Sequence, residues 1–418
     1  MTRISMMRLF IRAGLITVVA LIGSVLRPHA ATAATYHVAK TGSDANSCVQ
    51  AQNSSTAKLT IGAGLACIGT AAGAGAGHTV EVAAGTYTEA IRNSLPSGTS
   101  WSSPFTLKVK AGDVVTIRAT DESNIYQTAG SSLWTIISGF VLDGTNLSNN
   151  QVTINGPGFI RLTNLDIVNT TNWSGIYTGY SGNLEILNNK IHDGTFLPSG
   201  FGHALYIEGS DNLIEGNELY NLAAFGVHNY STAGNPSNNI VRKNKVYNFG
   251  LQRETATGIL LTSGSGNQAY NNIVFNGQGS LGDGGVGIAI GGCINCKVYN
   301  NTVYNNTWIG IDINNSTNAL VKNNIIYQNL VTFFGSGTGS VVTNNLTTDP
   351  NFVNAAAQDF HLQSGSPAID TGVTVTEVPN DFDLVVRPQG SAYDIGAYEF
   401  IFNLNSLNSP TNLQVTIP

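Results

Sequence analysis

The side chains best suited to proton transfer gather in two neighbouring repeats near the middle of the chain. One repeat carries His203, Tyr206 and Glu208, and the next carries His228 and Tyr230. Imidazole and phenol groups exchange protons, and a carboxylate can serve as a base. The sequence therefore predicts a catalytic group here, with His228 as base, Tyr206 or Tyr230 as proton donor and His203 as the alternative base.

Charged residues that follow in the sequence complete this hypothesis. Arg253 joins the catalytic candidates because it could hold a substrate carboxylate together with Lys243 or Lys245. The substrate-binding candidates are Tyr177, Glu208, Arg242, Lys243, Lys245 and Glu254. The alternative is that outward-facing Tyr, His and charged residues only keep a slim repeat protein soluble, and the sequence leaves both interpretations open.

A short repeat must position these residues. Its pattern is typified by Ile186 to Asp193, and its fixed Asn recurs at 189, 217, 244, 272, 301 and 324. Successive copies lie between 23 residues (301 to 324) and 29 residues (272 to 301) apart, which is in the range of solenoid repeats. Fourteen residues before several of these Asn, a Gly opens a second alternating segment, as at Gly175 and Gly258.

These segments are short, rich in Ile, Val and Tyr, and separated by Gly, Asn and Ser, so none can bury a face alone. Stacked coil on coil they form one continuous core. The sequence thus predicts an all-β, right-handed parallel β-helix with about three short strands per coil. Because counterparts stack about 4.8 Å apart, Tyr206 should lie over His228, and Glu208 over Tyr230.

Two further columns follow from the same register. The fixed Asn should form an internal ladder. The next outward column is aromatic in most coils, and it is either a structural ladder or a platform for sugar rings: His192, Tyr220, Tyr247, Phe275, Tyr304 and Tyr327. The short connection 222–225, set between the longer 194–203 and 249–257, predicts a cleft with His228 on its floor.

Composition favours one elongated body over two or three domains, because only 11% of the 418 residues are charged and 47 are Gly. Arg3, Arg8 and Arg12 surround an apolar run that precedes Ala31-Thr32-Ala33, which indicates a signal peptide over 1–34. Removing this segment, which includes four Arg and no acid, takes the net charge from −6 to −10. We expect a secreted or cell-surface monomer without a membrane span that does not bind nucleic acid.

Four cysteines in an exported chain permit disulfides. Cys48 and Cys67 flank the first segment and are expected to pair. Cys293 and Cys296 form a lone C-x-x-C without a second pair or a neighbouring His. A tight disulfide or two buried thiols is favoured there over a zinc site.

The segment from His78 to Glu89, together with later coils such as Asn244 to Asn248, resembles the pectate-lyase-like superfamily of secreted right-handed β-helix proteins. Residues 349–400 resemble the segment that follows such β-helices in exported bacterial proteins. This organisation implies an N-terminal cap and first coil over 35–100, the β-helix over 101–348, a β-rich cap over the open coil end at 349–400, and a tail from 401 to 418.

The superfamily includes lyases, hydrolases, epimerases and non-catalytic surface proteins, so the residues must decide. A glycoside hydrolase needs two carboxylates about 5 to 9.5 Å apart. Glu208 has no acidic neighbour one coil away, although Glu254 in a loop could supply one. Lyase or epimerase chemistry on a uronate polymer needs a base, an acid and a cation, which His228, Tyr206 and Arg253 provide.

The sequence therefore predicts action on an acidic extracellular polysaccharide, most simply by β-elimination. A non-catalytic carbohydrate-binding or structural surface protein is the alternative, and a glycoside hydrolase is the third hypothesis. The resemblance also brings in Ca²⁺, which many β-helix lyases employ, but the sequence does not require a cofactor. Acidic residues near the group could bind it, without a compact calcium-loop motif: Glu208, Asp211, Glu215 and Glu218.

Overall fold

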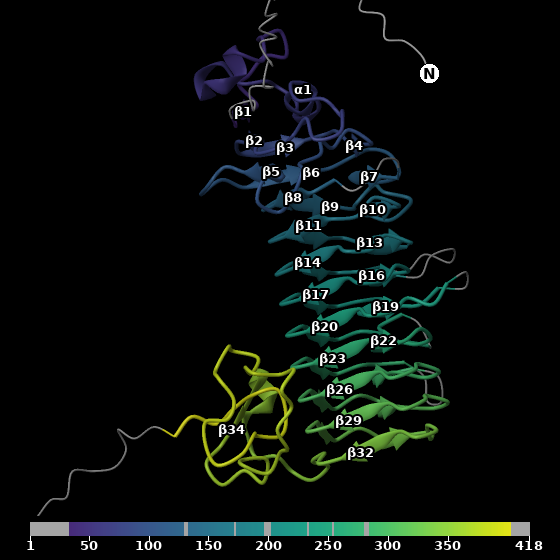
Figure 1. Ribbon diagram of the computed structural model, residues 1–418. Helices are drawn as coiled ribbons and strands as arrows, with labels where there is room; N and C mark the ends of the chain where they lie inside the picture. The colour runs from purple at the N-terminus through teal and green to yellow at the C-terminus, as the bar shows by residue number, and fades with distance from the viewer. Residues whose placement is uncertain are drawn as a thin grey trace, which may run out of the picture. The chain divides into compact units, whose positions relative to one another are not determined.

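The computed structural model describes residues 33–128, 133–170, 173–195, 202–231, 234–252, 255–279 and 284–402 (Figure 1). The predicted signal peptide lies outside the described residues except for Ala33 and Ala34, and so does the tail from residue 403 onward. Among the described helices, none is long and apolar enough to span a membrane.

The described coils build three parallel sheets, here named A, B and C. Sheet A has twelve strands: β1 (Thr35–Val38), β2 (Thr79–Val82), β5 (Phe105–Val109), β8 (Thr135–Ser138), β11 (Ile160–Thr163), β14 (Glu185–Leu187), β17 (Leu213–Glu215), β20 (Ile240–Arg242), β23 (Gln268–Tyr270), β26 (Lys297–Tyr299), β29 (Leu320–Lys322) and β32 (Val341–Thr343).

Sheet B has ten strands: β3 (Gly85–Tyr87), β6 (Val115–Ile117), β9 (Val141–Asp143), β12 (Asp166–Val168), β15 (Lys190–His192), β18 (Glu218–Tyr220), β21 (Lys245–Tyr247), β24 (Ile273–Phe275), β27 (Thr302–Tyr304) and β30 (Ile325–Tyr327). Sheet C also has ten: β4 (Ile91–Arg92), β7 (Ile125–Gln127), β10 (Val152–Asn155), β13 (Ser174–Gly179), β16 (His203–Ile207), β19 (Val227–Asn229), β22 (Thr257–Leu261), β25 (Val286–Ala289), β28 (Ile309–Asp312) and β31 (Val331–Phe334).

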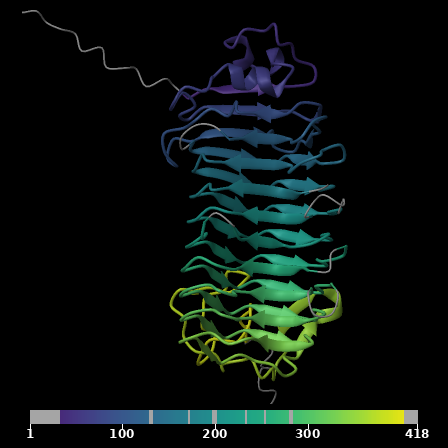
Figure 2. The same ribbon diagram turned by 90° about the vertical axis from the view of Figure 1, so that its right-hand side faces the viewer.

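Each coil runs from sheet A to sheet B to sheet C, and every strand pairs in parallel with its counterpart one coil away (Figures 1 and 2). In sheet C, for example, Leu205 pairs with Val227, which pairs with Ile259. These three residues are fully buried, as are their counterparts along the core. The predicted parallel β-helix with three strands per coil is confirmed.

The predicted Asn ladder is also confirmed. Each amide Nδ2 donates to the Oδ1 of the next coil's Asn at 2.9–3.0 Å, through residues 189, 217, 244, 272, 301 and 324. The same Oδ1 atoms accept backbone N–H groups, as when Asn189 N donates to Asn217 at 2.9 Å. Burying these polar amides is tolerated because their donors and acceptors are satisfied within the ladder.

The N-terminal end is covered by α1 (Ile61–Ala66) and the short helices η1 (Gln50–Gln52) and η2 (Ser54–Thr56). The Glu89 carboxylate accepts the backbone N–H groups of Ile61 and Gly62, at 2.8 and 3.0 Å, and so satisfies the start of α1. Cys48 and Cys67 form the predicted disulfide. Cys293 and Cys296 are fully buried, with their sulfur atoms paired.

The C-terminal segment contains β33 (Phe352–Asn354), η3 (Ala355–Ala357) and β34 (Asp359–Leu362), and the two strands pair antiparallel. It lies along the side of the last coils and not over their open end, which corrects the predicted position of this cap (Figures 1 and 2). The Phe360 ring packs on Phe275 of sheet B at 4.9 Å. At the end of the described coils, Val342 of β32 remains 40% exposed although it stacks on the buried Val321.

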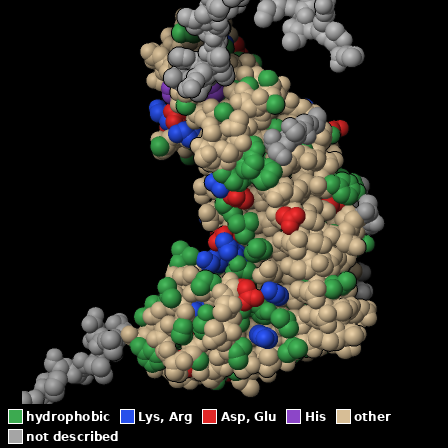
Figure 3. Space-filling model, viewed as in Figure 1, with side chains coloured by type: hydrophobic (Ala, Val, Ile, Leu, Met, Phe, Trp, Pro, Cys, Tyr) green, Lys and Arg blue, Asp and Glu red, His purple; other side chains and the backbone are tan. Residues whose placement is uncertain are grey.

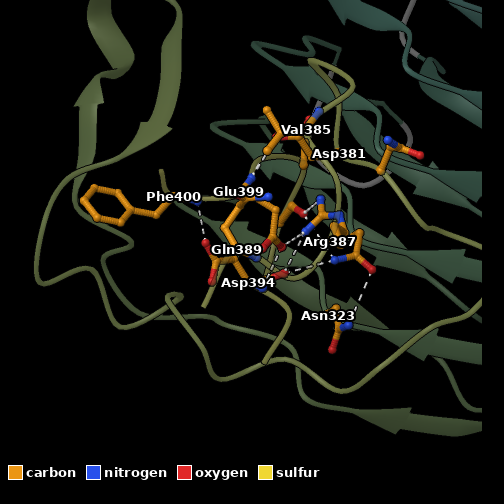
Figure 4. Close-up of polar contacts among 12 residues, drawn as sticks. Asn323, Asp381, Val385, Arg387, Gln389, Asp394, Glu399 and Phe400 are labelled. Atoms are coloured by element: carbon orange, nitrogen blue, oxygen red, sulfur yellow. Dashed lines mark hydrogen bonds and ion pairs between the residues drawn. The ribbon is translucent and has the colours of Figure 1, made fainter. Parts of the chain in front are cut away.

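A buried polar cluster ties this segment to the coils (Figure 4). The Arg387 guanidinium is fully buried, pairs with Glu399, and donates to the Asn271 side chain at 3.2 Å. Asp394 accepts the backbone N–H of Asp370 at 2.7 Å. Burial raises the pKa of Asp394 to about 6.

Candidate functional site

The outer face of sheet C carries one column of polar and aromatic side chains. In register from coil to coil, this column contains Tyr126, Thr153, Tyr177, Tyr206 and His228. Their inward neighbours, from Ile125 to Val227, are fully buried. Strand alternation therefore fixes the outward direction of the column.

A groove of about 480 Å³ lies over the upper part of this column. Four aromatic rings, one carboxylate and several amides and hydroxyls line it: Tyr126, Thr128, Asn149, Asn150, Thr153, Asn155, Trp173, Tyr177, Tyr206 and Glu208. Apolar ring surface next to hydrogen-bonding groups matches the two kinds of surface that a sugar ring presents. The sequence hypothesis placed the cleft over His228. The groove instead lies over coils that are N-terminal to His228.

Glu208 is held between two phenols at one end of the groove. Tyr177 Oη donates to Glu208 Oε2 at 2.8 Å, and Tyr206 also hydrogen-bonds to this carboxylate. Burial and the neighbouring Glu208 charge raise the pKa of Tyr206 to about 12, and burial and the hydrogen bond to Glu208 raise the pKa of Tyr177 further. Both phenols therefore keep their protons at neutral pH and can act as donors.

His228 lies next to Tyr206 in the following coil of sheet C. The two rings stack with centroids 4.7 Å apart, as the register predicted, and Phe225 and Tyr230 flank His228 at 4.7 and 5.8 Å. Neither His228 nor Tyr230 lines the groove, although both are partly exposed on the same face. The structure thus brings the predicted proton donor Tyr206 to the groove and places the predicted base one coil beyond it.

His203 is only 1% exposed. Its ring packs against Phe225 at 4.9 Å and His228 at 4.6 Å. His203 is therefore enclosed by aromatic rings and is not among the described residues that line the groove.

The basic residues do not join this group. Arg242, at the end of β20 in sheet A, donates to Glu215 at 2.7 Å and to the Tyr270 hydroxyl at 2.8 Å. Lys243 lines a separate cavity against the C-terminal segment, and Lys245 of sheet B lies over the Tyr247 ring at 5.3 Å. Neighbours in sequence thus occupy different faces, because the chain turns from sheet A to sheet B between them. Arg253 and Glu254 lie outside the described residues.

Several groove residues were missed by the sequence hypothesis: Tyr126, Thr128, Asn149, Asn150, Thr153, Asn155 and Trp173. The signal that could have found some of them is the apolar alternation at Ile125-Tyr126 and Val152-Thr153. It lies in coils whose spacing departs from the regular repeat.

The groove lining holds little charge. Glu208 is its acidic residue, and no Lys or Arg is among the described lining residues. Arg92 continues the column one coil before Tyr126, with its guanidinium 5.5 Å from that ring and paired with Asp121 at 2.8 Å. The described residues include no cluster of three His, Cys, Asp or Glu placed to hold a metal ion.

Comparison with known proteins addresses the fold. A family model described as "Right handed beta helix region" matches residues 108–274 and 174–347. A rhamnogalacturonan lyase structure is similar over 82% of this chain and 97% of its own, with a TM-score of 0.50 and 14% identity. The structure of pectate lyase Pel9A is similar over 87% of this chain and 96% of its own, with a TM-score of 0.49 and 15% identity. The structure of the periplasmic alginate epimerase AlgG is similar over 65% of this chain and 77% of its own, with a TM-score of 0.40 and 14% identity. A search of curated proteins found no match.

Proposed function

Because the chain belongs to the right-handed β-helix family and carries an aromatic groove on sheet C, we propose that it binds a polysaccharide in that groove and acts on it there. The single observation that carries this proposal is the groove itself, where four aromatic rings and several amides surround one carboxylate. A β-helix supports binding of a long polymer, because the stacked coils present a continuous surface to successive sugar units. The similarity to a rhamnogalacturonan lyase, at 14% identity, extends to the fold alone, so the proposal depends on the residues of this chain.

We propose β-elimination on an acidic polysaccharide as the reaction. A base removes the proton next to the sugar carboxylate, a carbon–carbon double bond forms, and the glycosidic oxygen leaves with a proton from an acid. Tyr206 is the proposed acid, because its phenol lines the groove beside Glu208. We propose Glu208, which lies at the groove itself, as the base, and His228, one coil beyond the groove lining, as the alternative base.

Hydrolysis has less support, because it requires a second carboxylate within about 9.5 Å and Glu208 is the acidic residue of the described groove lining. Non-catalytic carbohydrate binding is the second candidate function. The observation that favours it is the lack of Lys or Arg in that lining, since β-elimination needs the sugar carboxylate neutralised. We also propose export by residues 1–34 and action as a monomer outside the cell.

The test measures both binding and reaction on a panel of acidic and neutral polysaccharides, with and without Ca²⁺. Affinity electrophoresis reports binding, and ultraviolet absorbance reports the unsaturated uronate that a lyase produces. We expect Tyr206→Phe to lower turnover by about a hundredfold or more, because it removes the acid. Tyr247→Phe is the matched control, since its hydroxyl donates to Glu218 at 3.0 Å on sheet B.

The outcomes separate the hypotheses. Product that Tyr206→Phe abolishes and Tyr247→Phe preserves supports β-elimination in the groove. Binding without product overturns the reaction and leaves a carbohydrate-binding protein. Absence of binding to every polymer, or binding that groove substitutions do not alter, overturns the proposed groove.

A further inference from the structure

A second cavity, of about 440 Å³, lies on another face of the protein, between sheet A and the C-terminal segment. Its described lining is Leu187, Asn188, Glu215, Gly216, Lys243, Phe382 and Leu384. Figure 3 shows this flank hollowed above the C-terminal segment, with acidic and basic side chains gathered on its floor. It shares no residue with the sheet C groove.

Lys243 occupies an unusual position for its residue type. It has a φ of 54° at the turn from sheet A to sheet B, immediately before the ladder residue Asn244. The same turn position also has positive φ in other coils, where it is Asn or Gly: Asn164, Asn188, Gly216, Asn271, Asn300, Asn323 and Asn344. The left-handed region favours Asn and Gly over Lys, so the turn itself does not account for this lysine.

The Asn residues that follow Lys243 in this column hold the C-terminal segment. Asn271 donates to Asn380 O at 2.7 Å, Asn300 to Asp394 O at 3.0 Å, and Asn323 to Val373 O at 2.7 Å. Lys243 lies one coil before Asn271, at the edge of this contact. Lys243 therefore borders the cavity, whereas the Asn residues at the same turn in the following coils are covered by the C-terminal segment.

The charges around Lys243 leave its ammonium group loosely paired. Lys243 Nζ lies 3.9 Å from Glu215 Oε1, beyond hydrogen-bonding distance, while Glu215 Oε2 accepts from Arg242 at 2.7 Å. On the loop side, Asp381 accepts backbone N–H groups of Val385 and Glu399 at 2.8 and 2.9 Å. One carboxylate thus serves two cations at the cavity wall. Burial lowers the pKa of Lys243, which reports the partial desolvation of the ammonium.

The opposite wall is apolar. Phe382 is half-buried, and Leu384 exposes 65% of its surface at a φ of 71°. A leucine in the left-handed region is strained, and such strain persists where the surroundings or a ligand select it. The cavity therefore sets an apolar wall against an ammonium group and a carboxylate.

We propose that this cavity binds a sugar acid, with the sugar carboxylate on Lys243. The Asn188 amide can donate hydrogen bonds to ring hydroxyls and accept them, the Glu215 carboxylate can accept them, and Phe382 with Leu384 covers the apolar face of the ring. The inference rests on the proposed function only for the choice of a sugar as the ligand. The site would anchor an acidic polymer, or a uronate product, away from the sheet C groove.

Isothermal titration of the full mature chain with galacturonate, with galactose as the neutral comparison, tests this site. We expect saturable binding of galacturonate and a loss of affinity of about tenfold or more in Lys243→Asn, because a charge-assisted hydrogen bond is removed. Asn is the residue that other coils use at this turn, so the variant should fold. Lys190→Asn, at the start of β15 on sheet B, is the matched control and should bind as the wild type does.

A Leu384→Ala variant, expected to weaken binding as well, tests the apolar wall independently of charge. Wild-type protein that does not bind galacturonate, or binds galactose equally well, overturns the proposal. So does Lys243→Asn that binds with wild-type affinity. Loss of galacturonate binding in Tyr206→Phe would instead place the sugar acid in the sheet C groove, which overturns the second site while supporting the proposed function.

Discussion

Two aromatic columns run along this β-helix, on the outer faces of sheets B and C, and they are built differently. In sheet B the rings of His192, Tyr220, Tyr247 and Phe275 stack at 4.7, 5.2 and 4.9 Å, with interplanar angles of 5°, 5° and 9°. In sheet C, Thr153 interrupts the column, and Tyr177 and Tyr206 meet at 63°. The sheet B rings cover one another's faces, whereas the sheet C rings leave room for a groove.

The C-terminal segment deepens this difference. It packs on Phe275 and Tyr304 of sheet B through Phe360, at 4.9 and 5.5 Å, while sheet C stays open to solvent along the groove. Both columns hold a Tyr–Glu hydrogen bond, Tyr247 to Glu218 in one and Tyr177 to Glu208 in the other. The residue types alone therefore do not mark a site. Repetition favours a structural ladder, and its interruption favours a binding surface.

The largest predicted effect tests the difference between the two columns by releasing the C-terminal segment from sheet B. Arg387→Ala leaves Glu399 buried without its cation, so we expect about 3–5 kcal/mol of destabilisation of the C-terminal segment. Hydrogen exchange should increase over residues 349–402 and stay unchanged in the coils that carry the groove. Glycan binding that appeared on the uncovered sheet B would show that covering, and not ring geometry, separates the two columns.

Arg161→Ala provides the control for that change. Its guanidinium is about one-third exposed and pairs with Glu185 on the surface of sheet A, so we expect a loss below about 1 kcal/mol. An equal effect of the two substitutions would contradict the assignment of Arg387–Glu399 as the buried anchor of the segment.

A second, smaller effect sharpens the comparison by truncating one ring in each column. Tyr177→Ala should weaken polysaccharide binding by about 1.4–2.8 kcal/mol, or roughly tenfold to a hundredfold in dissociation constant, because it removes a ring from the groove. Tyr220→Ala, within the stacked sheet B column, should leave that constant unchanged. Affinity electrophoresis on the polymer that binds the wild type measures both. Equal losses would assign binding to sheet B as well.

The fold was predictable because each coil repeats the same local physics. The regular spacing of Asn189 and its counterparts predicts a buried ladder, and the apolar alternation at Leu205 and Val227 predicts columns that point inward. The strand register therefore follows from the spacing of the repeats alone. The vertical pairing of Tyr206 with His228 was correct for the same reason. The disulfide of Cys48 and Cys67 followed from the number and placement of the cysteines in a chain that we predict to be exported.

The site was only partly predictable, because it depends on what lies between the regular strands. Tyr126 and Asn150 come from coils with irregular spacing, so sequence gave no register for them. Lys243 and Lys245 are close to His228 along the chain, yet the turn at Lys243 sends them to other faces. Packing of the C-terminal segment on the side of the coils, through Phe360 and Arg387, depends on long-range contacts that no local pattern encodes.

The smallest predicted effect is a pH dependence in the stability of the C-terminal segment packed on sheet B. His361 bonds Asp359 at 2.6 Å and Asp383 at 3.0 Å. Burial alone would lower the pKa of His361, but these carboxylates raise it above its ordinary value of about 6.5. The charged imidazole therefore stabilises the segment fully below about pH 6.5, and this stabilisation is lost as pH rises through the raised pKa.

The hydrogen bonds to His361 also lower the pKa of Asp359, against the opposing effect of burial, so its contribution is lost only as pH falls below about 4. The side chains involved are nearly half exposed, and solvent screening limits the total to less than about 1 kcal/mol. Hydrogen exchange over residues 349–402, corrected for intrinsic rates, should be faster at about pH 8.5 than at about pH 5.5. His361→Gln should remove this difference while leaving the groove unchanged. A difference that persists in His361→Gln would contradict the assignment of the pH dependence to His361.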